Sequence, residues 1–287
     1  MTDSELFPPG SLAVVALPLG NPADITLRAL EVLRAADRIA AEDTRTVGRF
    51  LAAHGIRSRL ISYHDWNEAQ RTATLVEMLA AGERVALVSE AGTPGISDPG
   101  YDLVRRARRQ GYRVFPVPGP SALTGFLSAA GLPTDAFTFC GFPPSRPAKR
   151  RERFAALAGR EETLVFYESP RRILAALGDA LWAFGDRECA LAREMTKPHE
   201  EFLWGPLSQV RAALEGRPRV RGEICWGVRG AGRAGGGALL PLEAAVDQVL
   251  ARDLAPRQAA REVSRLAGVS AKEAYAAVLA HKGRRPA

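Results

Sequence analysis

The sequence predicts an α/β protein with two α/β-type domains and a small helical tail. Three observations predict this class. From residue 11 to 120, short apolar runs alternate with segments of helical periodicity, which is typical of a largely parallel sheet covered on both faces. From residue 121 to 229, predicted strands follow one another more closely, as in a mixed α+β domain. A glycine-rich linker at residues 230–238 then precedes an all-helical pattern at residues 239–287.

The first domain, residues 11–120, is expected to contain four strands. They are predicted at residues 12–17, 38–41, 85–88 and 113–117. Asp24 is expected to cap the first helix, because apolar residues follow it at helical spacing. The segments between residues 43 and 83 and between residues 98 and 111 carry helical patterns.

The second domain, residues 121–229, is expected to contain five strands. They are predicted at residues 137–142, 163–167, 189–193, 202–204 and 223–228.

The tail is predicted to hold three short helices. Ser270 is expected to cap the last one, and Ala274, Val278 and Leu279 to close a small core. The tail resembles a helix-turn-helix unit, which leaves open whether it contacts RNA or only stabilises the protein.

Composition excludes several classes of protein. No apolar run among the 287 residues reaches the roughly 18 residues needed to cross a bilayer, so no membrane partner is expected. Cys140, Cys189 and Cys225 are far apart and show neither disulfide nor zinc spacing, so we expect a reducing cytoplasm and no metal. The net charge of +7 favours a polyanionic partner.

Three loops at the ends of predicted strands stand out. They lie at residues 18–22, 89–100 and 118–122 and are rich in glycine, proline, serine and alanine. Small residues let a backbone approach a ligand closely, and ligands of open α/β sheets bind at the carboxyl ends of strands. The loops therefore predict a shared, nucleotide-like pocket. The spacing Gly230-x-Gly232-x-x-Gly235 is no dinucleotide fingerprint, because it follows the last strand and opens no βαβ unit.

Motifs from about residue 11 to residue 228 carry a family resemblance. They are, in order, PLGNP at 18–22, AEDTR at 41–45, HDWNE at 64–68, VSEAGTP at 88–94, DPG at 98–100, PGPSA at 118–122, FYESP at 166–170 and AREMTK at 192–197. The sequence resembles the ribosomal RNA small subunit methyltransferase I family, within the tetrapyrrole methylases. Position 90 is Glu where the family pattern has Asp, a mild departure.

The resemblance implies the tetrapyrrole-methylase (class III methyltransferase) fold, with S-adenosylmethionine bound between the two domains of each subunit of a homodimer. It implies methylation of the ribose 2′-hydroxyl of a cytidine in the 16S rRNA decoding centre, on rRNA or the small ribosomal subunit. The cofactor site it implies comprises Pro18, Ala91, Gly92, Thr93, Ile96, Ser121, Ala122, Glu168 and Met195.

The residues leave the catalytic base open. A ribose hydroxyl is a poor nucleophile until its proton leaves, so a general base is expected. The candidates are Glu42, Asp43, Glu90, Glu194 and Lys197.

Basic side chains suggest where RNA phosphates would bind. Expected contacts are Arg45 and the run Arg146, Lys149, Arg150, Arg151 and Arg153. Two other functions stay open. One is a methylase of the same fold acting on a tetrapyrrole or another small molecule, and the other is a non-catalytic RNA-binding protein that retains the cofactor fold.

Overall fold

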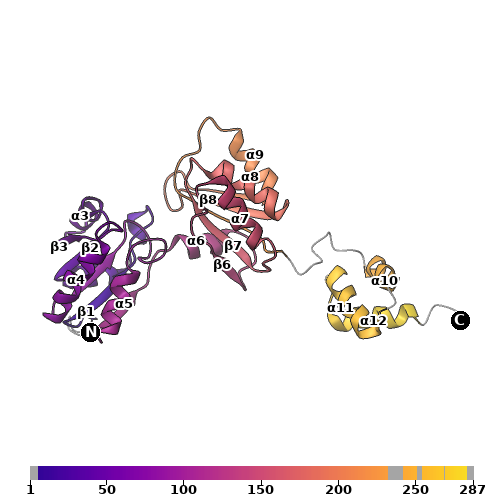
Figure 1. The fold of residues 1–287 in the computed structure, drawn as a ribbon, viewed down its shortest axis with the longest axis horizontal. Coiled ribbons are helices and arrows are strands. Elements are labelled where there is room, and N and C mark those ends of the chain that lie inside the picture. Colours follow the sequence, from indigo (N-terminus) through magenta and orange to yellow (C-terminus); the bar gives the residue numbers. More distant parts are fainter. Residues whose placement is uncertain (1–5, 232–241, 251–253, 268, 283–287) are drawn as a thin grey trace.

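The computed structural model describes residues 6–231, 242–250, 254–267 and 269–282. Two five-stranded sheets, each with its own helices, are followed by a group of three helices (Figure 1). The α/β class and the helical tail are as predicted. Most of the predicted linker, residues 232–238, lies outside the described residues. The domain limits themselves remain predictions, with the expected border at residues 120 and 121 falling between the last strand of the first sheet and the next helix.

The first sheet is parallel throughout and has the order β3-β2-β4-β1-β5. Its strands are β1 (Ser11–Val15), β2 (Arg38–Ala41), β3 (Arg59–Ser62), β4 (Val85–Val88) and β5 (Arg113–Val117). Its helices are α2 (Leu27–Ala35), α3 (Thr44–Ala53), α4 (Glu68–Ala80) and α5 (Tyr101–Arg109).

The side chains of the central strands point alternately to the two faces of this sheet, and each face has its own hydrophobic core. Ala13 and Val15 of β1 pack with α2 and α3, whereas Leu12 between them packs with α4 and α5. Successive side chains of a strand point to opposite faces, so a strand buried on both faces is apolar throughout. The helices therefore cover both faces of the sheet, and the strand ends and their loops stay uncovered.

Strand β3 was not predicted, because residues 43–83 were expected to be helical. It is a four-residue strand that pairs with β2 alone, and none of its residues is fully buried. Only Leu60 and Ile61 are apolar within it. An edge strand this short carries no hydrophobic period, so its neighbour in the sheet decides its conformation.

The first helix begins differently from the prediction. Asn21 caps a short 3₁₀ helix, η1 (Pro22–Asp24), by accepting from the backbone N–H of Ala23 at 3.1 Å. Thr26 then caps α2, accepting from the N–H of Ala29 at 3.1 Å. The predicted capping role of Asp24 is therefore wrong. Pro22 favours a helical turn that begins before α2, so the chain uses two caps in succession, Asn21 for η1 and Thr26 for α2.

The second sheet is mixed and has the order β6-β7-β10-β8-β9. Its strands are β6 (Phe137–Phe139), β7 (Thr163–Glu168), β8 (Glu188–Arg193), β9 (Glu201–Pro206) and β10 (Ile224–Val228), and only the β6–β7 pair is parallel. Helices α7 (Pro147–Leu157), α8 (Ile173–Phe184) and α9 (Leu207–Glu215) pack on one face around Trp226. Helix α6 (Ala122–Ala129) packs on the other face through Phe126.

The tail helices are α10 (Leu242–Leu250), α11 (Pro256–Ala267) and α12 (Ala271–Lys282), and they share a core of their own. The predicted cap by Ser270 is confirmed, since its hydroxyl accepts from the N–H of Glu273 at 3.2 Å. Ala274 and Val278 are buried as predicted, but Leu279 is 47% exposed and closes no core. None of the described helices is long and apolar enough to cross a membrane.

One basic residue expected to contact RNA is instead buried between helices α7 and α8. The Arg150 side chain is 4% exposed and lies 2.7 Å from the Asp179 carboxylate of α8. It also donates to the carbonyls of Pro144 and Ser145. The prediction for Arg150 is therefore wrong. Helical spacing places it with Phe154 on the buried face of α7, away from solvent.

The Arg150–Asp179 pair yields a stability prediction. Burial raises the pKa of Asp179, but hydrogen bonds from Arg151 and Arg150 outweigh it and hold the pKa below its usual value. Asp179→Ala should lower the free energy of unfolding by about 3–5 kcal/mol, because it leaves the Arg150 charge buried and unpaired. Denaturant unfolding at neutral pH measures this loss.

The matched control is Glu215→Ala, which removes the exposed Arg211–Glu215 pair of α9 and should cost only about 0.3–0.5 kcal/mol. Because the Asp179 pKa is lowered on folding, the stability from this pair should persist above about pH 4 and fall as the pH drops further. Equal losses in the two variants would contradict the assignment.

Candidate functional site

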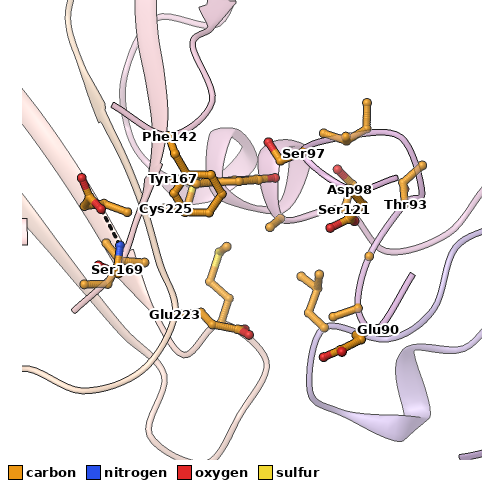
Figure 2. A pocket seen from close by; sticks show the side chains of 18 of the residues that line it. Glu90, Thr93, Ser97, Asp98, Ser121, Phe142, Tyr167, Ser169, Glu223 and Cys225 are labelled. Carbon is orange, nitrogen blue, oxygen red and sulfur yellow. Dashed lines mark hydrogen bonds between the residues drawn. The ribbon is translucent and has the colours of Figure 1, made fainter. Parts of the chain in front are cut away.

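A cavity of about 430 Å³ lies between the two sheets. The first sheet contributes loops that follow β1, β2, β4 and β5. The second sheet contributes the segments after β6, β7 and β8 and the start of β10. Figure 2 shows Glu90, Asp98 and Ser121 on one side, facing Tyr167 and Glu223 on the other. The loop-rich edge predicted from the sequence is thus one wall of a cleft that both halves of the chain build.

Most of the residues expected to bind a cofactor line this cavity. Those that do are Ala91, Gly92, Thr93, Ile96, Ser121, Ala122, Glu168 and Met195. Pro18 is not among the lining residues, and its neighbour Leu19 takes that place. That these residues hold a cofactor remains a prediction.

Hydrogen bonds between loops fix the first wall. Leu17 and Gly92 exchange two backbone bonds of 2.9 Å, which tie the β1 loop to the β4 loop. The Thr93 hydroxyl donates to the carbonyl of Pro120 at 3.0 Å, which ties the β4 loop to the β5 loop. Because the loops hold one another, the wall is organised before a ligand enters.

Three carboxyl groups, of Glu42, Glu90 and Asp98, line the same wall. Burial, together with repulsion from Glu90 and Asp65, raises the pKa of Glu42. Burial and the charge of Glu42 raise the pKa of Asp98 to about 7, although a hydrogen bond with Ser89 opposes the shift. A carboxyl group that titrates near neutral pH can take up a proton from a substrate there. Within the described ranges, no cluster of three or more His, Cys, Asp or Glu side chains is arranged to hold a metal ion.

Glu168 provides a buried acceptor on the opposite wall. Its side chain is fully buried, and its Oε1 accepts from the Ser169 N–H at 2.7 Å and pairs with Arg172 at 2.6 Å. Its Oε2 is also buried and has no hydrogen-bond partner among the described residues. An unsatisfied buried acceptor costs free energy. The cavity therefore presents an oxygen that a donor group of a bound molecule would satisfy.

Apolar and aromatic side chains form the rest of the lining. Leu19, Ile96 and Met195 face the cavity, as do the rings of Phe142 and Tyr167, whose centroids are 5.7 Å apart. Cys225 also lines it, but burial raises the pKa of its thiol, so it stays protonated and is a poor nucleophile. This surface suits a flat, partly apolar ligand.

Two of the candidate bases, Glu194 and Lys197, pair with each other outside the cavity lining. Lys197 Nζ lies 3.0 Å from both Glu194 Oε1 and Glu223 Oε2. Burial alone would lower the pKa of Lys197, but the hydrogen bonds with Glu223 and Glu194 raise it overall. Burial alone would raise the pKa of Glu194, but hydrogen bonds from Lys197 and from the Glu223 backbone N–H lower it overall. A lysine held in its charged form is unsuited to accept a proton. The pair instead fixes the loop that carries Met195.

This loop also connects the two halves of the chain. The Thr196 hydroxyl accepts from the backbone N–H of Asn21 at 3.2 Å, although Thr196 has a left-handed φ of 65°. The Lys197 stem lies so close to Gly20 that a Cβ on residue 20 would overlap it. The loops after β1 and β8 therefore meet beside the cavity.

Asp43 and Arg45 form a helix cap. The Asp43 side chain accepts from the Arg45 N–H at 2.8 Å at the start of α3, and Arg45 also pairs with it. Hydrogen bonds from the Arg45 side chain and backbone lower the pKa of Asp43 to about 2. Asp43 is absent from the cavity lining, and so strong an acid is a weak base. Of the five candidate bases, Glu42 and Glu90 line the cavity, whereas Asp43, Glu194 and Lys197 do not.

The sequence interpretation named no role for Asp98, Phe142 or Tyr167, all of which line the cavity. Asp98 could have been found from its place in the same small-residue loop as Glu90. Phe142 and Tyr167 belong to the second sheet, and no local pattern shows that their strand ends face the first.

Comparisons with known proteins agree with this architecture. The family described as Tetrapyrrole (Corrin/Porphyrin) Methylases matches residues 11–211. Ribosomal RNA small subunit methyltransferase I of Escherichia coli O157:H7 is 48% identical over 77% of this chain and 78% of its own length. The chain belongs to the ribosomal RNA small subunit methyltransferase I family of the tetrapyrrole methylases. The protein of the same name from Vibrio cholerae serotype O1 is 43% identical over 93% of this chain and 94% of its own.

Solved structures show the same fold. Uroporphyrin-III-C-methyltransferase from Thermus thermophilus matches with a TM-score of 0.54 and 26% identity, over 77% of this chain and 94% of that chain. A cobalt precorrin-4 methyltransferase matches with a TM-score of 0.58 and 16% identity, over 79% and 97%. The predicted class III methyltransferase fold is confirmed.

The Lys197 contacts predict a positioning role. Lys197→Met removes both ion pairs and should loosen the loop that bears Met195, so the affinity for the methyl donor should fall several-fold. Turnover at saturating substrate should fall far less than the roughly 10²–10⁴-fold expected for loss of a general base. Calorimetry and initial rates measure the two effects, and Lys197→Arg should restore much of the affinity. A collapse of turnover with unchanged affinity would instead make Lys197 the base.

Proposed function

We propose that this protein transfers a methyl group from S-adenosylmethionine to the ribose 2′-hydroxyl of a cytidine in the decoding centre of 16S rRNA. The observation that carries the proposal is the cavity itself, in a chain of this family. It has apolar surface, an unsatisfied buried acceptor on one wall and three carboxyl groups on the other. The 16S rRNA, free or in the small ribosomal subunit, is the partner.

The residues present fit S-adenosylmethionine. Leu19, Ile96 and Met195 offer apolar surface for a purine ring, and Glu168 Oε2 offers an acceptor for a hydroxyl or amino group. A cavity of about 430 Å³ lies within the roughly 300–1,000 Å³ range of small-molecule sites. We assign the cofactor-binding role to Leu19 and to the eight predicted residues that line the cavity, in place of Pro18.

Bound there, S-adenosylmethionine supplies a methyl group on a sulfonium centre whose leaving group departs as a neutral thioether. The protein must then orient the ribose hydroxyl, exclude water and accept its proton. Asp98 is the best placed acceptor in the cavity, because it is half-buried and its pKa lies near neutrality. Glu42 and Glu90 keep that pKa high by adding negative charge, and the negative wall attracts a cationic cofactor.

The proposed RNA contacts are the exposed basic residues of the predicted set. Arg146, Lys149 and Arg153 are exposed around the start of α7, and the Arg45 side chain is 87% exposed beside the cavity wall. Arg151 is half-exposed but shares Asp179 with Arg150, so it offers less to a phosphate. A homodimer and a cytoplasmic location are part of the same proposal. They are supported by the family resemblance and by the ribosomal substrate.

Methylation of ribosomal subunits tests the proposal. Small subunits from a strain that lacks the endogenous enzyme are incubated with the protein and S-adenosylmethionine, and the rRNA is digested and measured by mass spectrometry. One new 2′-O-methylcytidine in the decoding centre is the expected product. Cofactor binding without RNA methylation would favour a non-catalytic role, and methylation of an added tetrapyrrole instead of RNA would favour a small-molecule methylase.

Asp98 gives this proposal a pH signature. A general base acts when deprotonated, so kcat/KM should rise with pH through about 7 and level off above it. Asp98→Asn should abolish that rise and lower the rate about 10²–10⁴-fold. Asp43→Asn is the control, because the Asp43 carboxyl is already ionised at neutral pH and lies outside the cavity. An unchanged pH profile in Asp98→Asn would exclude Asp98 as the base.

A further inference from the structure

The loop between β3 and α4 carries an aromatic side chain that neither the cavity nor the core uses. The Trp66 side chain is 96% exposed. A single exposed apolar residue needs no explanation in itself. Trp66 calls for an explanation because of where it lies and because hydrogen bonds fix its loop.

Parallel pairing places this loop in the same row as the cavity loops. Strand β3 lies beside β2, and both end at the edge where Glu42 and the β4 loop form the cavity wall. The charge of Asp65 raises the pKa of both Glu42 and Asp98, and His64 also acts on Glu42, so the loop lies within electrostatic reach of the cavity. Trp66 follows directly in the chain.

The loop is held at both ends. Asn67 Oδ1 accepts from the His64 N–H at 2.9 Å, and Asn67 Nδ2 donates to the Ser62 carbonyl at 3.2 Å. Glu68 accepts from the buried Tyr63 hydroxyl at 2.9 Å and from the Gly100 N–H at 3.2 Å, close to Asp98. The exposed indole therefore projects from a fixed loop, and that loop is hydrogen-bonded to the segment that carries Asp98.

The same loop holds an unsatisfied donor. Asn67 Nδ2 lies 3.1 Å from His64 Nε2, so that nitrogen accepts and His64 Nδ1 carries the proton. His64 Nδ1 is buried and has no partner among the described residues.

The electrostatics of this region select the kind of contact. Asp65 acts on both Glu42 and Asp98, so this loop adds negative charge and does not itself attract a phosphate, a contact that is left to Arg45. A nucleobase is uncharged and has an apolar face, and its stacking on an aromatic ring tolerates any base.

Resting on the proposed function, we infer that Trp66 stacks on a nucleobase next to the target nucleotide and holds the RNA strand open at the cavity mouth. A ribose that enters the cavity must leave the regular helix, so the base beside it loses a stacking contact, and an indole face replaces that contact. Trp66 is thus a positioning residue for the RNA and has no part in binding the cofactor.

The test compares Trp66→Ala with Trp66→Phe, which retains a stacking ring. The control is Trp204→Ala, which removes another exposed indole, on β9 against Gly131. Binding of a decoding-centre RNA fragment is measured by anisotropy, methylation by initial rates and cofactor binding by calorimetry. Trp66→Ala should weaken RNA affinity by roughly 5- to 150-fold with unchanged cofactor affinity, whereas the other two variants should change little.

Intrinsic fluorescence adds an independent readout. RNA should quench wild-type emission by stacking on the indole, and Trp66→Phe should lose most of that quenching. The inference is overturned if Trp66→Ala binds RNA normally while the wild type methylates it, which leaves the proposed function intact. It is also overturned if Trp66→Ala changes the sedimentation of the free protein, because the indole then lies between two copies of the chain. A wild type that neither binds nor methylates RNA would overturn both proposals together.

Discussion

Strand direction is the constraint on which the site depends. Because every strand of the first sheet runs the same way, the loops after β1, β2, β4 and β5 gather at one edge and are able to share a ligand. The second sheet meets this edge through the ends of β7 and β8 and the beginning of β10. The ends of β7 and β8 and the beginning of β10 lie on the same side of the sheet only because β10 runs antiparallel to both strands. A parallel β10 would carry Glu223 and Cys225 to the far edge.

The charge of the molecule is divided in a way that suits two unlike ligands. The whole chain is basic, with a net charge of +7, yet the cavity wall carries Glu42, Glu90 and Asp98. A negative, partly desolvated interior favours a cation, whereas exposed arginines attract a polyanion from solution. The two attractions act in different places, so neither ligand needs to displace the other.

Much of the architecture follows from local sequence, and the failures have physical causes. Buried strands such as β4 are apolar throughout and bounded by small-residue loops, so they were predicted. Strand β3 was missed because only its pairing with β2 makes it a strand.

In the site, too, some features follow from local sequence and others depend on distant partners. The first wall could be predicted from glycine- and proline-rich loops, because one strand end determines each loop. The roles of Arg150 and Lys197 could not, since each depends on a carboxylate that the sequence places elsewhere: Asp179 on α8 and Glu223 before β10. Charge in a sequence does not tell which charges are already neutralised by a partner in the fold.

Thr196 joins the two halves of the chain at the expense of backbone strain. A β-branched residue at a φ of 65° is strained, and asparagine or glycine would relieve the strain. Its hydroxyl, however, accepts from Asn21 and joins loops from opposite halves of the chain. A library selected for heat resistance alone would therefore tend to replace Thr196, whereas one selected for methylated ribosomes would tend to keep it.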